Sequence, residues 1–248
     1  MALVSEAYSE FEHRYIAEST VSPTGGKRQE MGGQREDAEM TNDQLSFAVE
    51  KMFEESIRVK EELCSRAKGT VVEMAELVSR AFLAKHRLFI FGNGGSAADA
   101  QHLAAEFVNR FQIERPPLPA MALTVDTSIL TSIANDYNFD DVFLKQLLAL
   151  AQPGDIALGI STSGRSSNVI KALHWARENG VLTMGLGGLA ETEMDLCCDI
   201  IIHVPSPVTA RVQECHIIIG HVICALVDEI IYGRDPRGED LNRQIDSV

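Results

Sequence analysis

Side chains that can bind metals recur at helical spacing in two separate segments of the chain. His102 and Glu106 are four residues apart, so a helix would place both on one face. Gln213 and His221 are eight residues apart and again share a helical face. Two imidazoles, a carboxylate and an amide oxygen form a credible ligand set for Zn²⁺ or a similar divalent ion. The spacing leaves an alternative open for each segment: a surface pair at His102 and Glu106, and a buried core histidine at His221.

A loop rich in hydroxyl groups follows a short apolar segment. Its hydroxyl-bearing residues are Ser161, Thr162, Ser163 and Ser166. A helical pattern follows the loop, and helix N-termini attract anions through unpaired N–H groups and the macrodipole. The loop therefore favours a small phosphorylated ligand, although a helix cap with surplus serines has the same composition.

A second small-residue loop reads Gly92-Asn-Gly-Gly-Ser96. It does not fit the GxGxxG dinucleotide motif. The lysine of a P-loop is absent as well. These departures disfavour a nucleotide as the ligand.

Short apolar segments alternate with helical patterns from residue 87 onward. The predicted strands cover residues 87–91, 120–124, 155–160, 181–186 and 200–204. The predicted helices cover 97–111, 128–134, 141–150, 167–179 and 209–232. Such alternation predicts the α/β class, with a single doubly wound parallel sheet covered on both faces. Ligands bind such sheets at the carboxyl ends of the strands, where both small-residue loops fall.

The segments outside this alternation differ in composition. Residues 1–40 carry two Gly-Gly pairs and scattered charges with almost nothing to bury, which predicts a disordered extension. From Thr41, apolar residues recur at helical spacing, and a second helix is predicted over 70–85. We expect these helices to pack against other subunits. The domain itself is predicted over 41–235, and a flexible tail over 236–248.

The composition restricts the classes of partner. The 248 residues include 36 acidic and 22 basic side chains, a formal net charge of −14, which argues against binding nucleic acid or an anionic membrane through bulk charge. The longest uncharged apolar stretch, 217–227, is far shorter than the roughly 20 residues that span a bilayer. We expect no secretory signal in residues 1–10. The five cysteines lack CxxC spacing, which is typical of reduced thiols in a cytoplasmic protein.

Taken together, the motifs resemble the phosphoheptose isomerase family of the sugar isomerase (SIS) fold in order and spacing. The resemblance runs from about Thr41 to Tyr232 and rests on the segments Gly92–Ser96, His102–Glu106, Asn135–Asp136, Ser161–Ser166 and Arg211–His221. It implies conversion of D-sedoheptulose 7-phosphate to D-glycero-D-manno-heptose 7-phosphate through an enediolate, the first step of bacterial heptose biosynthesis for lipopolysaccharide or other surface glycans. It also implies a cytoplasmic homotetramer with one Zn²⁺ per subunit.

The resemblance assigns a role to each matched residue. The substrate-binding positions are Asn93, Gly94, Gly95, Ser96, Glu106, Asn135, Asp136, Ser161, Thr162, Ser163, Ser166 and Gln213. The metal ligands are His102, Glu106, Gln213 and His221. The catalytic pair is Glu106, expected as the base, and His221, expected as the acid.

The sequence departs from the family pattern at some positions, and two alternative functions remain open. Ala210 stands where some members carry an aspartate, and residues 185–193 are an unusual form of the glycine-bearing loop. One alternative function is a non-catalytic SIS-fold tetramer that binds the replication initiator protein, and another is a domain that senses a sugar phosphate. The initiator-binding group lacks the residues matched by Glu106 and His221, so the isomerase is favoured.

Overall fold

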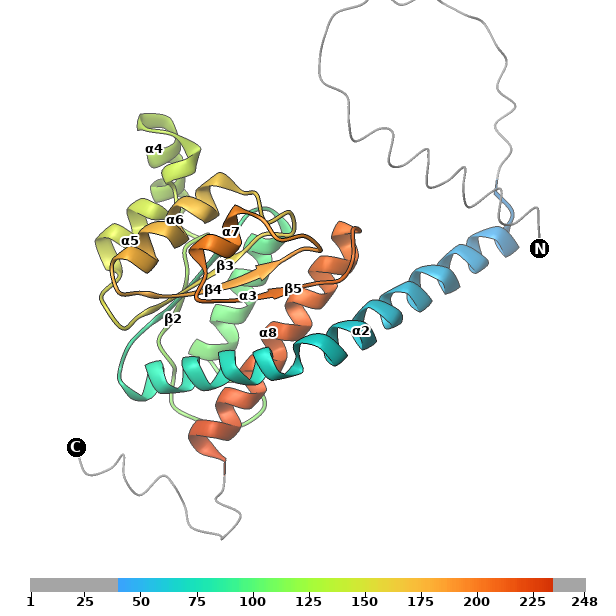
Figure 1. The fold of residues 1–248 in the computed structure, drawn as a ribbon, viewed down its shortest axis with the longest axis horizontal. Helices are drawn as coiled ribbons and strands as arrows, with labels where there is room; N and C mark the ends of the chain where they lie inside the picture. The colour runs from blue at the N-terminus through green and yellow to red at the C-terminus, as the bar shows by residue number, and fades with distance from the viewer. Residues whose placement is uncertain (1–39, 234–248) are drawn as a thin grey trace, which may run out of the picture. The chain divides into compact units, whose positions relative to one another are not determined.

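The computed structural model describes residues 40–233, and the predicted extension, apart from Met40, and the predicted tail lie outside the described residues. Within residues 40–233 a five-stranded sheet has the order β2-β1-β3-β4-β5, and every neighbouring pair is parallel (Figure 1). The strands are β1 Leu88–Gly92, β2 Ala120–Ala122, β3 Ile156–Ile160, β4 Leu182–Gly187 and β5 Ile200–His203. The predicted parallel α/β fold is confirmed.

Helices cover both faces of the sheet. They are α2 Asn42–Leu83, α3 Gly95–Val108, α4 Thr127–Asp136, α5 Leu144–Leu150, α6 Ser167–Glu178, α7 Glu193–Cys197 and α8 Thr209–Tyr232, with a 3₁₀ turn, η1, at Phe139–Asp141. The buried side chains of α2, α3 and α8 form one core with Leu88 and Ile90 of β1. Those of α6 and α7 form a second core with Phe89 and Phe91. The alternation along β1 is the period-two pattern of a strand buried on both faces.

One prediction about helices is wrong, and one helix was not predicted. The two predicted N-terminal helices are one continuous helix, α2, with Gly69 in its interior. Ala67 and Val71 on either side of Gly69 are buried, and this packing offsets the roughly 0.5–1 kcal/mol that an interior glycine costs. The short helix α7 was not predicted, although Thr192 and Asp195 form the capping box that starts it.

Helix α8 is long and apolar enough to cross a membrane by length and composition, with a mean hydropathy of 1.7. Half of the 18-residue apolar stretch of α8 that passes this test is buried inside the protein, as in the core helix of a soluble fold. All five cysteines are free thiols, and all but Cys64 are buried.

The fully buried histidine of α8 is His216, whereas His221 is only partly buried. The His216 Nε2 atom donates to the Gly187 carbonyl at 3.0 Å, and its Nδ1 atom has no partner among the described residues. Burial lowers the pKa of His216 from 6.5 to about 4. The imidazole is therefore neutral in the folded protein at neutral pH.

The neutral state of His216 predicts a loss of stability in acid. Its folded pKa lies below its unfolded value, so the unfolded chain binds more protons as the pH falls from 6.5 towards 4. The free energy of unfolding should fall by about 2 kcal/mol from this group between pH 6.5 and 5. Urea unfolding across this range measures it. His216→Gln, which can still donate to Gly187, should give a shallower pH dependence, and an equal slope would contradict the prediction.

Candidate functional site

The two small-residue loops lie side by side at the carboxyl edge of the sheet. Strands β1 and β3 are neighbours, with Gly92 in register with Ile160. Strand β1 pairs with β2 on its other side, so this position is the topological switch point where such sheets bind ligands. Asn93 after β1 and Asn168 in α6 exchange two amide hydrogen bonds of 2.9 Å, which join the loops.

The hydroxyl-rich loop turns tightly between β3 and α6. Gly164 has a φ of 63°, a left-handed conformation that glycine adopts without strain. Ser161 is buried, and its Oγ lies 3.0 Å from the Oγ of Ser166, the N-cap residue of α6. The Ser163 hydroxyl is exposed and accepts from the Arg165 N–H at 3.2 Å. The loop thus gathers hydroxyls at the start of a helix, as an anion site requires.

A second loop, between β4 and α7, packs against the hydroxyl-rich loop. A Cβ atom on Gly188 would lie 2.1 Å from the carbonyl oxygen of Thr162, so the two backbones are in direct contact. The Thr192 hydroxyl donates to the Gly164 carbonyl at 2.7 Å. This is the glycine-bearing segment with the unusual sequence, and its glycine allows the close approach.

A chain of polar contacts holds this supporting loop. The Asp195 carboxylate accepts from the Thr192 N–H and from His203 Nε2, both at 2.7 Å. His203 Nδ1 lies 2.8 Å from the Gly188 carbonyl. Burial acts to raise the pKa of Asp195, but the hydrogen bonds from Thr192 and His203 outweigh it and lower the pKa.

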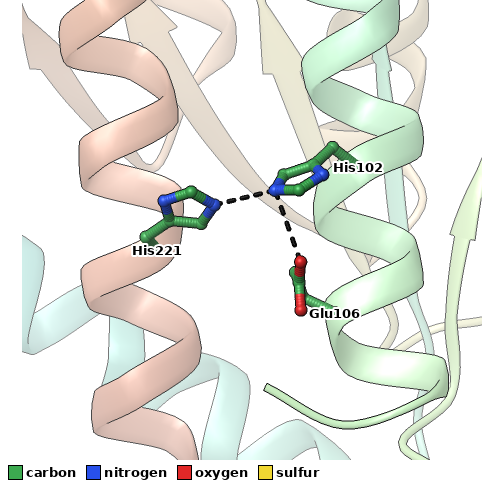
Figure 2. A group of neighbouring side chains, drawn as sticks. All are labelled: His102, Glu106 and His221. Carbon is green, nitrogen blue, oxygen red and sulfur yellow. Dashed lines mark hydrogen bonds and ion pairs between the residues drawn. The ribbon is translucent and has the colours of Figure 1, made fainter. Parts of the chain in front are cut away.

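His102, Glu106 and His221 come together between α3 and α8 (Figure 2). The His102 Nε2 atom lies 2.8 Å from His221 Nε2 and 3.3 Å from Glu106 Oε1. One ligand atom from each residue falls within 4.8 Å of the others. Ligand atoms around a tetrahedral Zn²⁺ are about 3.4 Å apart, from bonds of about 2.1 Å. The three side chains therefore fit a divalent metal.

Close packing of α3 and α8 produces this convergence. A Cβ atom on Gly220 would lie 2.4 Å from a methyl carbon of Leu103, so the helices approach closely where the histidines meet. A Cβ on Gly95 would meet the Gln213 amide nitrogen at 2.2 Å. Gln213 therefore packs against the start of α3, about 10 Å along the helix from the level of His102. The structure brings three of the four predicted metal ligands together and places Gln213 beside the loop after β1.

Asp99 is a candidate site residue that sequence reasoning missed. It lies one turn before His102 on α3, and its Oδ2 atom is buried without a partner in the described part of the chain. Burial raises the pKa of Asp99, and the nearby His102 opposes that shift. The spacing of three residues from His102 is the signal that could have revealed it.

Asn135 and Asp136 lie on the other layer of the molecule. Both are exposed near the end of α4, and Asn135 Nδ2 donates to Asp136 Oδ1 at 2.9 Å. Leu130 and Ile133 of α4 pack against the core of α6 and α7, not that of α3 and α8 (Figure 1). Within one chain these two residues therefore do not join the cluster of His102.

Comparison with known proteins gives consistent matches. The SIS domain family model matches residues 51–188. A phosphoheptose isomerase of Nitratidesulfovibrio vulgaris (strain Hildenborough) is 51% identical over 193 residues, which cover 78% of this chain and 92% of the relative. A phosphoheptose isomerase of Aquifex aeolicus is 47% identical over 186 residues, 75% of this chain and 97% of the relative. The structure of a phosphoheptose isomerase from Neisseria gonorrhoeae superposes with a TM-score of 0.71 at 42% identity, covering 75% of this chain and 99% of that one.

Proposed function

The chain belongs to the phosphoheptose isomerase family of SIS-domain proteins, and from this membership we propose that it converts D-sedoheptulose 7-phosphate to D-glycero-D-manno-heptose 7-phosphate. The observation that carries the proposal is the convergence of His102, Glu106 and His221 between α3 and α8, which begin after the carboxyl ends of β1 and β5. The hydroxyl-rich loop at the same edge supports a phosphorylated substrate. Turnover of sedoheptulose 7-phosphate by the purified protein tests it.

The reaction moves one proton between C1 and C2 of the sugar. We assign Glu106 as the base that takes the proton from carbon and His221 as the acid that protonates the carbonyl oxygen, with the roles exchanged in reverse. The loop Ser161–Ser166 holds the phosphate away from the reacting carbons and supplies orientation. A divalent ion bound by the cluster supplies Lewis-acid stabilisation of negative charge on the sugar oxygens.

Remaining substrate contacts are assigned from the family pattern. We propose that Asn93, Gly94, Gly95, Ser96 and Gln213 contact the sugar, and the packing of the Gln213 amide against Gly95 supports this grouping. The resemblance also assigns Gln213 as a fourth metal ligand, which requires its amide to reach towards the histidine pair. Asn135 and Asp136 complete the proposed substrate contacts.

Zinc binding gives a direct test of the cluster. We expect about one Zn²⁺ per chain, and His102→Ala should lower the zinc content because it removes a ligand. Because histidine binds metal as the neutral imidazole, zinc affinity should also fall in acid. Metal analysis after exhaustive dialysis measures the content. His174→Ala is a matched control, because the exposed His174 pairs with Glu178 at the same four-residue spacing on α6. Equal zinc in the wild type and His102→Ala would remove this ligand set.

We propose a homotetramer in the cytoplasm. Helix α2 exposes a row of apolar side chains in its first half: Leu45, Val49, Met52, Phe53 and Ile57. Helix α4 buries no residue in this single chain and exposes Ile129. Such apolar surfaces are typical of subunit contacts. Light scattering of the purified protein tests the oligomeric state, and the free thiols support a reducing compartment.

A further inference from the structure

A buried arginine connects the two helices that carry the metal cluster. Arg115 Nε donates to Asp228 Oδ1 on α8 at 2.6 Å. Its Nη1 donates to the Phe107 carbonyl at 2.7 Å and its Nη2 to the Glu106 carbonyl at 2.9 Å, both at the end of α3. The side chains of Arg115 and Asp228 are 1% and 4% exposed, so water does not replace these contacts.

The contacts to α3 satisfy a general need of helix ends. The last carbonyls of a helix have no partner within the helix, and a cation there is favoured by the macrodipole. The planar guanidinium group of Arg115 supplies both the hydrogen-bond donors and the positive charge, and its donors hold a fixed geometry. One of the two carbonyls belongs to Glu106 itself, so the contact fixes the backbone from which this metal-cluster side chain projects.

The contact to α8 fixes the position of α3 along α8, because Arg115 binds the end of α3 and Asp228 of α8 at the same time. Asp228 follows His221 by seven residues, two turns along the same side of α8. The helices also meet at Leu103 and Gly220, beside the histidine pair. The cluster therefore lies close to both fixed points, and sliding or rotation of α3 against α8 would separate its ligand atoms.

Stability alone does not account for this ion pair. Burying two charges is expensive, and well-packed apolar replacements of buried ion pairs are often neutral or stabilising. Asp228 Oδ2 also has no hydrogen-bond partner among residues 40–233, so the arrangement carries an unsatisfied buried atom. We propose that Arg115 and Asp228 are positioning residues, which hold α3 and α8 in the register that the metal ligands require. This proposal rests on the metal centre proposed above.

The test separates metal binding from stability. The variants are Arg115→Lys, which keeps the charge but loses the planar fork, and the apolar pair Arg115→Met with Asp228→Leu. The zinc Kd of the full chain is measured by competition with a chromogenic chelator, and the Tm is measured on the metal-free protein. We expect both variants to raise the zinc Kd by about 10–100-fold, as loss of supporting contacts around metal ligands does. The apolar pair should keep a Tm near that of the wild type.

Arg177→Met is the matched control. Arg177 also donates to a helix-end carbonyl, that of Leu196, and pairs with Asp199, but on the α6–α7 side of the sheet. Its zinc Kd should stay at the wild-type value. A folded apolar pair or Arg115→Lys with a zinc Kd within about twofold of the wild type would overturn the positioning role. If the apolar pair does not fold, Arg115→Lys alone decides. A wild type that binds no zinc would overturn the metal centre together with this inference, whereas a zinc-binding wild type with unaffected variants overturns only the inference.

Discussion

Glu106→Gln is expected to lower kcat by about 10²–10⁴-fold, the range typical for loss of a positioned base. Gln keeps the size of the side chain and an oxygen that can face His102, but it cannot accept the proton from the sugar carbon. His221→Gln should lower kcat by a similar factor through loss of the acid. Steady-state turnover of sedoheptulose 7-phosphate measures both. In D₂O, the wild type should place deuterium at C2 of the aldose.

Two controls distinguish loss of the catalytic base from loss of the metal or of the fold. Zinc content is determined for each variant, because Glu106 and His221 are also proposed ligands, and an amide oxygen can still bind a divalent ion. Glu178→Gln is the matched control, since Glu178 forms the equivalent four-residue pair with His174 on α6. It should leave kcat unchanged. A Glu106→Gln enzyme with near-normal kcat would exclude Glu106 as the base, whatever the fold.

The alternation of elements could be predicted because each strand and helix has its own local pattern. The bounds predicted for the closing helix, 209–232, agree with those of α8. The buried histidine of α8 was harder to identify, because the helix contains two histidines in or beside its apolar segment, His216 and His221. The buried residues of α8 include Val212, Cys215 and Ile219, and His216 follows that stripe whereas His221 does not. The phase of the stripe, rather than its hydrophobicity, decides which histidine is buried.

The metal cluster shows where local patterns stop being sufficient. Spacing placed His102 and Glu106 on one face of a helix, but the distance to His221 depends on how α3 packs against α8. The two helices meet at Leu103 and Gly220, and Arg115 links them through its ion pair with Asp228. An aspartate within the apolar closing helix, Asp228, indicates a buried partner, yet the sequence does not say which cation provides it.

Gly188→Ala is expected to lower kcat/KM for the sugar phosphate by about 10²-fold, mainly through a higher KM. The added Cβ would lie 2.1 Å from the Thr162 carbonyl oxygen, a backbone atom that no side-chain rotation can move away. Since Gly188 is not among the glycines with positive φ, the strain comes from lack of space rather than from backbone conformation. The hydroxyl-rich loop must then shift away from the phosphate. Steady-state kinetics measures the change.

Competition by inorganic phosphate tests whether the higher KM of Gly188→Ala comes from weaker phosphate binding at the hydroxyl-rich loop rather than from a slower chemical step. Inorganic phosphate is expected to compete for the proposed phosphate site in the hydroxyl-rich loop, so its inhibition constant should rise in parallel with KM. The zinc content should stay unchanged, because the proposed metal ligands lie on α3 and α8. Gly69→Ala is the matched control: a Cβ there meets nothing within 4 Å, and it should add about 0.5–1 kcal/mol of stability without changing KM. If Gly188→Ala kept both constants at the wild-type values, the contact between the two loops would not set the phosphate site. If only KM rose, the shifted backbone would act on the sugar, and the phosphate would have to be held elsewhere.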